Sequence, residues 1–549
     1  MIEHRDARRI PATNAQDDRL WDELADLPVA ELNERAAMAR AEGDVAMAAA
    51  CLQRASSLMP DDPDVNVQMG ELLTSGERYE SAIACFRHAI QVNPDHLGAH
   101  RSLGKALFLR GDEAEGIHSF RRAVRVAPED GEARLLLGTA LRRAGAVNEA
   151  LQCLRIAMEI EPERVEAGYH LGLVCRTMDR PDDARVAFEH VLLADPTHRF
   201  AEAAMLSMDA ESHGRAVAER QDGRKTALYM TDQVDYFSLR SIFDALCADH
   251  WPLFSADIRE ITEFRPDSIL TVSRRLSRLR APMPGCPVIQ IPKLAVRRPE
   301  SIVHDASADA VCVVSDEEQQ IFLDAGLSQH RVWLTGLPLM DPVFSGNVRH
   351  RPHPGTDTKQ ARKMVLYMPD WRREVSAEPA MREALVQLCL ARNGAFDVVV
   401  RPHPVTLVQQ QSWVDGWVDL SASCPNLTVH VEPGVNHLSL MAEADLLLSD
   451  FSSLAVTFMA FNTPLVLIRP RLDAPPQHRL SDRQTGLLES VATCLDGGAD
   501  VVGHVVKSLE HPNVNDESRA RMRSVVFGGS ADGHAAIRTV SLLRDFLYA

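Results

Sequence analysis

The sequence predicts an α-helical solenoid followed by two doubly wound α/β domains, and three observations support this. Proline recurs every 34 residues through the first third of the chain. From Lys225 onward, short apolar runs alternate with stretches of helical character, the pattern of buried parallel strands and covering helices. A polar, proline-rich stretch at 346–363 divides this alternation into two series. A chain of 549 residues has room for all three parts.

Three kinds of position keep the 34-residue period. They are Pro60, Pro94, Pro128, Pro162 and Pro196; the small residues Gly70, Gly104, Gly138, Gly172, Ala82, Gly116, Ala150 and Ala184; and the large apolar residues Phe86, Phe120, Leu154 and Phe188. Small residues let paired helices approach, a large residue fills the groove between them, and proline ends the second helix. Four units lie at 63–96, 97–130, 131–164 and 165–198, and a degenerate unit lies at 29–62.

This period and these positions resemble the tetratricopeptide repeat, a helix–turn–helix unit. Arrays of such units stack into a curved solenoid with a concave binding face. The resemblance implies that this face recruits a protein or polymer acceptor. A spacer or oligomerisation arm is the alternative interpretation.

The remaining boundaries follow from composition and strand pattern. The predicted parts are an N-terminal segment at 1–28, repeats at 29–200, a capping helix and linker at 201–224, a first α/β half at 225–345, an interdomain loop at 346–363 and a nucleotide-binding half at 364–549. Predicted strands are 226–230, 268–272, 287–291, 309–314 and 332–336 in the first half, and 364–369, 396–402, 427–431, 445–449 and 464–468 in the second. Ligands of such sheets bind at the carboxyl ends of the strands.

The tetrapeptide Arg-Pro-His-Pro occurs twice, and its two copies have different contexts. The copy at 351–354 lies in the interdomain loop with no strand before it, so a stiff linker is its simplest interpretation. The copy at 401–404 directly follows the strand "FDVVV". Arg401 and His403 are therefore predicted at a ligand-binding edge, where charge-assisted hydrogen bonds to a phosphate contribute about 1.5–3 kcal/mol each.

Other candidate site residues also follow predicted strands. Ser452 and Ser453 occupy the strand-to-helix turn in "DLLLSDFSSLAVTF", where a helix N-terminus favours an anion, and plain helix capping is the alternative. Arg372 follows the strand "MVLYMP" and is predicted to reach a phosphate unless it forms a surface ion pair. Asp450 and Asp341 are further candidates, Asp341 equally as a hinge or cap residue.

Four segments together carry a family resemblance. "VLYMPDWRR", "VVVRPHP", "AEADLLLSDFSSLAVTFMAFNTPLVLI" and "GLPLMD" resemble the CDP-glycerol:poly(glycerophosphate) glycerophosphotransferases, most strongly over 334–470. The resemblance implies a GT-B fold, a cytidine-nucleotide donor, and nucleotide-phosphate binding by His403, Ser452 and Ser453. The His-Pro and Ser-Ser pairs are also similar to transferases that use CMP-sialic acid or CMP-Kdo. No Asp-x-Asp motif is present in this region, so we expect no metal cofactor.

The predicted catalytic base departs from the family pattern. The family has a histidine followed by glycine after a first-half strand, whereas "VIQIPKLAVRR" has Lys293 near that place. Lysine acts as a base only with a strongly depressed pKa. His304 lies a few residues later and is the substitute candidate, although a structural role is also open.

Charge and cysteine content indicate which classes of partner and which cellular compartment to expect. A net charge of −18 argues against a nucleic-acid partner, and ten scattered cysteines indicate a reduced cytoplasmic interior without a cysteine metal site. No secretory signal or 18-residue apolar run is present. The basic stretch "RRLSRLR" at 274–280 suggests peripheral contact with the inner membrane face, with a solvated helix face as the alternative.

Three functions remain open on the sequence alone. The first is a capsule- or teichoic-acid-type transferase that uses CDP-glycerol or a CMP-sugar. The second is a protein O-glycosyltransferase that places a nonulosonic acid on flagellin. The third is a non-catalytic scaffold in which only the repeats act.

Overall fold

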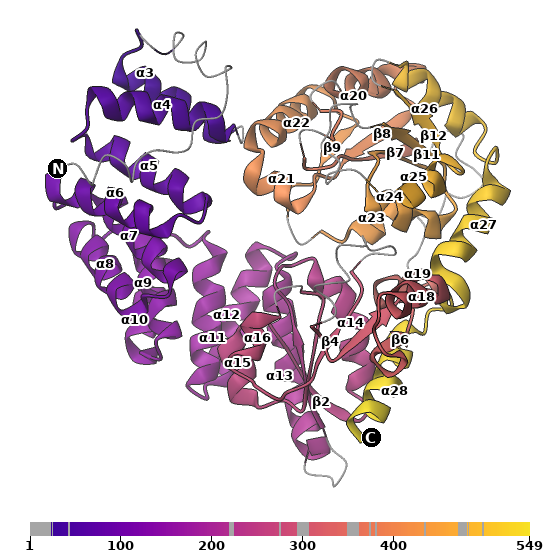
Figure 1. The fold of residues 1–549 in the computed structure, drawn as a ribbon, viewed down its shortest axis with the longest axis horizontal. Helices are drawn as coiled ribbons and strands as arrows, with labels where there is room; N and C mark the ends of the chain where they lie inside the picture. The colour runs from indigo at the N-terminus through magenta and orange to yellow at the C-terminus, as the bar shows by residue number, and fades with distance from the viewer. Residues whose placement is uncertain are drawn as a thin grey trace. The chain divides into compact units, whose positions relative to one another are not determined.

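The computed structural model describes residues 24, 26–41, 44–218, 224–273, 276–293, 307–347, 362–372, 375–378, 381–432, 435–469, 480, 482–496 and 499–548. The chain forms two compact units (Figure 1). The repeats lie within Met1–Pro196, and the second unit holds Thr197–Val408 and Trp413–Ala549.

The repeat unit consists of helix hairpins at the predicted period. Its helices are α3 (Val29–Ala41), α4 (Val45–Leu58), α5 (Pro63–Ser75), α6 (Tyr79–Val92), α7 (Leu97–Arg110), α8 (Glu113–Val126), α9 (Gly131–Arg143), α10 (Val147–Ile160), α11 (Val165–Thr177) and α12 (Pro181–Ala194). The degenerate unit is therefore a fifth helix pair, α3 and α4.

The glycine of each clear repeat is required by the large residue of the same repeat. A Cβ atom on Gly70 would lie 2.5 Å from a ring carbon of Phe86, and one on Gly172 would lie 2.4 Å from a ring carbon of Phe188. Non-bonded carbon atoms do not approach this closely, so only glycine at these positions allows the two helices to pack at this distance. The small–large pairing in the sequence is thus a packing rule of the repeat.

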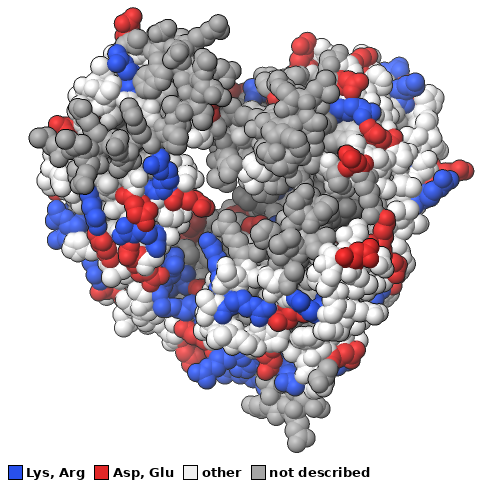
Figure 2. Space-filling model, viewed as in Figure 1, with Lys and Arg blue, Asp and Glu red and all other residues white. Residues whose placement is uncertain are grey.

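Charged side chains of both signs are interspersed over the repeat helices on the face in view (Figure 2). Several join neighbouring repeats, such as Lys105 with Glu132 at 2.8 Å and Arg121 with Glu149 at 2.7 Å. Exposed pairs of this kind contribute about 0–1 kcal/mol each. The apolar seams between the helices therefore hold the array together.

The described residues of the second unit form two six-stranded sheets, and every strand pair in both is parallel. The first sheet has the order β2-β1-β3-β4-β5-β6, with β1 (Arg224–Tyr229), β2 (His250–Ser255), β3 (Ser268–Thr271), β4 (Val288–Gln290), β5 (Ala310–Val313) and β6 (Val332–Leu334). The second has the order β12-β11-β10-β7-β8-β9, with β7 (Lys363–Met368), β8 (Phe396–Val400), β9 (Leu427–Val429), β10 (Leu446–Asp450), β11 (Leu465–Ile468) and β12 (Thr493–Leu495). This is the predicted α plus α/β architecture.

Helices cover both faces of each sheet (Figure 1). In the first half these are α14 (Asp235–Leu246), α15 (Ile258–Phe264), α16 (Ser277–Arg280), α18 (Asp316–Asp324) and α19 (Asp341–Phe344). In the second half they are α20 (Met381–Leu390), α21 (Pro404–Gln409), α22 (Gln411–Ser423), α23 (His437–Glu443), α24 (Ser453–Phe458), α25 (Asp482–Glu489), α26 (Val501–Glu510) and α27 (Asp516–Phe527).

Helix α13 (Arg199–Ala218) differs from the capping helix and linker expected at 201–224. It belongs to the second unit and packs on the first sheet. The hydroxyl of Ser207 accepts the backbone N–H of Phe254 in β2 at 2.8 Å, and a Cβ on Gly214 would collide with the ring of Trp251. This helix is therefore a covering layer of the α/β unit.

The C-terminal helix α28 (Ala535–Tyr548) returns to the first half, although it follows the second half in sequence. Ala536, Val540 and Leu543 pack in the same apolar cluster as Trp333 of β6. Asp341 accepts the backbone N–H groups of Ala535 at 2.9 Å and Ala536 at 2.8 Å. Asp341 therefore caps a helix that starts about two hundred residues later. The cap role that the sequence left open is realised, and a role in the site stays a prediction.

Replacing Asp341 with alanine is expected to lower the free energy of unfolding of the second unit by about 1–3 kcal/mol, because two N–H groups lose their acceptor. Five of the six tryptophans lie between Trp251 and Trp417, so fluorescence during urea unfolding reports on this unit. Asp324→Ala on the exposed face of α18 serves as the control. A midpoint of Asp341→Ala equal to that of the control would contradict the capping role.

Candidate functional site

The carboxyl edge of the second sheet gathers the polar residues that follow three neighbouring strands. Arg401 and His403 follow β8, Asp370 and Arg372 follow β7, and Ser452 follows β10. The strands β8, β7 and β10 are adjacent and parallel, so their carboxyl ends lie at one edge. Strand order reverses between β7 and β10, which is the position where ligands of doubly wound sheets bind.

Arg401 is a buried cation at this edge. Its Nη1 donates to the carbonyl of His430 at 3.1 Å, and its backbone N–H donates to Tyr367 at 2.9 Å, which continues the ladder between β7 and β8. Burial lowers the pKa of the Arg401 guanidinium to about 10, and the charge of Glu432 opposes this. A desolvated cation of this kind is stabilised by an anion.

His403 is held at the start of α21 by its own ring. The ring Nδ1 accepts the backbone N–H of Val405 at 3.1 Å, so the neutral ring carries its proton on Nε2. Desolvation lowers the pKa of His403, although part of the ring is exposed; Asp370 opposes this, and the cations Lys293, Arg372 and Arg401 reinforce it. We therefore interpret His403 as a neutral ring that donates through its Nε2–H, whereas the charge-assisted hydrogen bond expected from the sequence would need a protonated ring.

His437 is a site residue that sequence reasoning missed. It is the first residue of α23, which Asn436 caps, and its ring lies 6.2 Å from that of Phe237 in the first half. Desolvation and the charges of Arg401 and Lys293 lower the pKa of His437. The segment "VNHLSL" has the pattern of an ordinary helix start, so it gave no signal.

Lys293 lies past the end of β4 and forms ion pairs with two carboxylates. Its Nζ is 2.9 Å from Oδ2 of Asp232 and 2.8 Å from Oδ1 of Asp235, both of which follow β1. Burial alone would lower the pKa of Lys293, but the two carboxylates outweigh it and raise the pKa. The ion pairs therefore favour the charged form of Lys293 and argue against the predicted role of this residue as the base.

The two carboxylates beside Lys293 differ in exposure and in the direction of their pKa shifts. Asp235 is buried and also accepts the backbone N–H and the hydroxyl of Thr231, both at 2.8 Å; burial raises its pKa. The side chain of Asp232 is 51% exposed. Burial favours its protonated form, but the charge and hydrogen bond of Lys293 prevail and lower the pKa of Asp232. Asp232 is thus the accessible, ionised carboxylate of this cluster.

The charge of Arg372 is partly neutralised by an ion pair with Asp370. Its Nε donates to Oδ1 of Asp370 at 2.8 Å, and the pair is largely buried. The ring of the intervening Trp371 lies 6.3 Å from that of His403. Arg372 is therefore close to the site, but a phosphate would share it with Asp370.

Asp450 is completely buried and organises the turn after β7. Its carboxylate accepts the backbone N–H groups of Asp370 at 2.8 Å and Ala377 at 3.0 Å. Burial raises the pKa of Asp450 to about 7, although these hydrogen bonds oppose it. Asp450 thus joins the end of β10 to the turn after β7. Because its two hydrogen bonds lie on either side of Trp371 and Arg372 in sequence, it holds the backbone that carries these residues.

Asp450 gives the second unit a predictable pH dependence. Between about pH 4 and 7 the folded state keeps the Asp450 proton and the unfolded state loses it, so stability falls as pH rises through this window and then levels. Asp450→Asn is expected to remove this part of the dependence of stability on pH. The urea midpoint of the variant should therefore change less between about pH 4.5 and about pH 7.5 than that of the unmodified chain. An unchanged slope would contradict the raised pKa.

The structure says less about the remaining predicted site residues. Ser452 caps α24, where its hydroxyl accepts the N–H of Ala455 at 3.4 Å, so the capping alternative is realised and phosphate binding stays a prediction. Ser453 begins α24, a helix of only 6 residues, and its side chain lies outside the description. His304 and the first Arg-Pro-His-Pro copy also lie outside the described residues.

Within the described residues, no three or more His, Cys, Asp or Glu side chains are placed to hold a metal ion. None of the described helices has the length and apolar character needed to cross a bilayer. In the basic stretch at 274–280, Leu279 is buried and Arg280 pairs with Asp309 at 2.7 Å. A lipid-binding role for this stretch stays a prediction.

Comparison with protein families matches both parts of the chain. Residues 293–481 match the CDP-Glycerol:Poly(glycerophosphate) glycerophosphotransferase family, and residues 67–117 and 114–162 match the tetratricopeptide repeat. The first of these ranges begins at Lys293 and contains Arg401, His403 and Ser452. No curated protein is similar enough to count as a match.

Several solved structures are similar to the repeat part. A MamA RS-1 double mutant is 21% identical, with a TM-score of 0.29, covering 31% of this chain and 95% of that one. YrrB, described as a TPR protein with an unusual peptide-binding site, is 20% identical, with a TM-score of 0.29, covering 35% and 99%. A thermophilic TPR protein of Thermus thermophilus is 18% identical, with a TM-score of 0.29, covering 33% and 98%. The two family matches place a tetratricopeptide repeat region within 67–162 and, after it, a region of the glycerophosphotransferase type at 293–481, which supports a transferase.

Proposed function

We propose that the second unit transfers a group from a cytidine-nucleotide donor, CDP-glycerol or a CMP-sugar, to an acceptor hydroxyl. The observation that carries this proposal is the cluster of Arg401, His403, His437 and Lys293, in which burial first, and then the charges of Arg401 and Lys293, lower the pKa values of the two histidines. Such a cluster at the switch point of a doubly wound sheet favours a phosphate ligand.

Both donor types release the same product. With CDP-glycerol, the acceptor oxygen bonds to the β-phosphorus as the bond from that phosphorus to the CMP oxygen breaks. With a CMP-sugar, the acceptor oxygen bonds to the anomeric carbon as the bond from that carbon to the phosphate oxygen breaks. In either case negative charge grows on the phosphate of CMP, where Arg401 and the Nε2–H of His403 would stabilise it.

Asp232 is the proposed acceptor of the hydroxyl proton. It is ionised, accessible, and linked through Lys293 to the cluster that contains His403. A carboxylate of low pKa is a weak base, but phosphoryl transfer through a loose transition state needs mainly orientation of the attacking hydroxyl, and protein kinases use an aspartate for this. Lys293 would hold the carboxylate in place.

The repeats are proposed to recruit the acceptor, because arrays of this type bind partners on their concave face. Which acceptor binds is a separate question from which donor reacts. A pull-down with the full chain, compared with a chain that lacks residues 29–196, would separate a protein acceptor from a polymer.

The proposal is tested by CMP release. Purified full-length protein is incubated in EDTA with CDP-glycerol, and separately with CMP-sialic acid, together with a glycerophosphate oligomer or a candidate protein acceptor. Acceptor-dependent CMP release from one donor is the expected result. No release from either donor with any acceptor, by a protein that is folded, would favour the scaffold interpretation.

A further inference from the structure

A pocket with both polar and apolar lining residues lies at the opposite edge of the second sheet from His403. It has a volume of about 170 Å³ and is lined by Pro464, Leu465, Val491, Thr493, His504, Lys507, Ser508, His511, Pro512, Val514, Asn515 and Arg519. Leu465 and Thr493 are the first residues of β11 and β12, so the pocket is at the amino edge. His403 follows the carboxyl end of β8, which lies three strands away from β11, so the two places are separated by more than one strand length of about 15 Å. The pocket is therefore separate from the candidate transfer site.

The charge of the pocket is positive. Lys507 and Arg519 line it, and no aspartate or glutamate does. The nearest carboxylates have other partners: Asp516 lies 3.4 Å from Arg519 and also accepts the side chain of Asn462, and Asp500 caps α26 through the N–H of Gly503. Lys507 forms no ion pair with any described residue. The pocket thus carries an excess of cationic charge.

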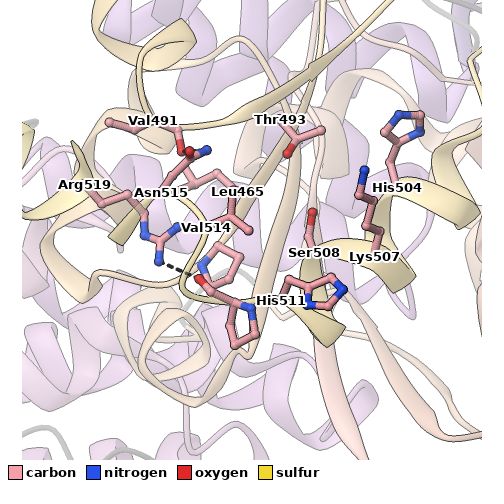
Figure 3. A pocket seen from close by; sticks show the side chains of 12 residues that line it. Leu465, Val491, Thr493, His504, Lys507, Ser508, His511, Val514, Asn515 and Arg519 are labelled. Atoms are coloured by element: carbon pink, nitrogen blue, oxygen red, sulfur yellow. Dashed lines mark hydrogen bonds between the residues drawn. The ribbon is translucent and has the colours of Figure 1, made fainter. Parts of the chain in front are cut away.

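The pocket also has more donors than acceptors. Arg519 is buried; its Nη2 donates to the carbonyl of Pro512 at 2.7 Å and its Nε to that of Asn462 at 3.3 Å, which leaves Nη1 without an acceptor among the described residues. The hydroxyls of Thr493 and Ser508 likewise have no hydrogen-bond partner within the described part of the chain. In the view of Figure 3, His504 and Lys507 stand on one side and Arg519 on the other, with Ser508 and His511 between them. A ligand that suits these groups is rich in acceptor oxygens.

The volume of the pocket suits a small anion. An engineered cavity of roughly 150 Å³ holds benzene, so this pocket has room for a phosphate group with a short polar substituent. Val514, which is 78% exposed, and the rings of Pro464 and Pro512 supply an apolar margin. A phosphate has four oxygens for the convergent donors, and it would neutralise the charge of Lys507 and Arg519.

We propose that the pocket between α26, α27 and the amino ends of β11 and β12 is a second anion site, which binds inorganic phosphate or a phosphate monoester. Arg519 and Lys507 supply the charge, and Ser508, Thr493 and His511 supply further hydrogen bonds. The inference does not depend on the proposed transfer reaction, because a phosphate would bind here whether or not the carboxyl edge is catalytic.

The test is calorimetric titration of the full chain at low ionic strength with inorganic phosphate and with glycerol 3-phosphate. The pocket variant Lys507→Gln/His511→Asn changes two exposed residues of the pocket and is expected to weaken phosphate binding at this site by about tenfold or more. Two control variants are expected to bind phosphate at this pocket as tightly as the unmodified chain. Arg392→Gln removes an exposed cation that pairs with Glu510, a residue of α26 like Lys507. His403→Ala changes only the carboxyl edge of the sheet.

The outcomes decide the proposal. Loss in the pocket variant alone, together with amide protection of 501–519 by phosphate in hydrogen exchange, supports it. Equal binding by the pocket variant and the unmodified chain overturns it, as does loss only in His403→Ala, which would place all phosphate binding at the carboxyl edge. Capture by anionic vesicles without binding of either soluble phosphate would also overturn it, in favour of a membrane surface.

Discussion

His403→Ala is expected to lower kcat by about 10²–10³-fold, the loss typical of removing one preorganised donor from a developing anion. The ring offers its Nε2–H because Nδ1 is occupied by the N–H of Val405. We expect KM for the donor to change less than kcat, because charge on the CMP phosphate grows as the bond breaks. The measurement is steady-state CMP release at saturating donor.

Two controls separate chemistry from folding in this experiment. His403→Asn keeps an acceptor for the N–H of Val405 and so preserves the cap of α21, while its shorter amide withdraws the donor. His353→Ala changes the same tetrapeptide in the copy at 351–354 and is expected to leave kcat unchanged. Full activity in His403→Ala, or equal losses in both alanine variants, would contradict the assignment.

Asp232→Asn is expected to lower kcat by about 10²–10⁴-fold, because the amide cannot accept the acceptor's proton. Since Lys293 holds the pKa of Asp232 below its ordinary value, this carboxylate stays ionised throughout the neutral range. Protonation of Asp232 is therefore not expected to lower kcat above about pH 5. The lower kcat of Asp232→Asn is expected at every pH in that range.

Asp244→Asn is the matched control for that variant, since Asp244 is an exposed carboxylate of the first half, paired with Arg240 on α14. It is expected to leave kcat unchanged. Donor binding should also survive in Asp232→Asn, which a CMP titration would check. Unimpaired turnover by Asp232→Asn would show that another group removes the proton, and His304 would be the next candidate to test.

The sequence predicted the fold well where local patterns carry the information. The 34-residue period is local, and each predicted strand is a short apolar run, so both were found. Strand β2 was missed because Pro252 interrupts "HWPLFS"; a proline is tolerated there because β2 is an edge strand. The short strand β12 was missed because "TCL" is too brief to show a pattern.

The site was predicted in part, and its errors share one physical cause. Arg401 and His403 follow a strand directly, so their position could be inferred from neighbours in sequence. The roles of Lys293 and Asp341 could not, because each depends on a distant partner: Asp232 and Asp235 lie about sixty residues before Lys293, and α28 lies about two hundred residues after Asp341. Protonation states depend on such contacts, and sequence spacing does not reveal them.

The central claim is that the carboxyl edge of the second sheet binds the phosphate of a cytidine nucleotide. Titration of CMP in EDTA into the unmodified protein and into Arg401→Met tests it most directly, because CMP is the leaving group of both proposed donors. We predict that the unmodified protein binds CMP and that Arg401→Met binds it at least about tenfold more weakly. Equal affinity of the two proteins, or no binding of CMP by the unmodified chain, would contradict the account.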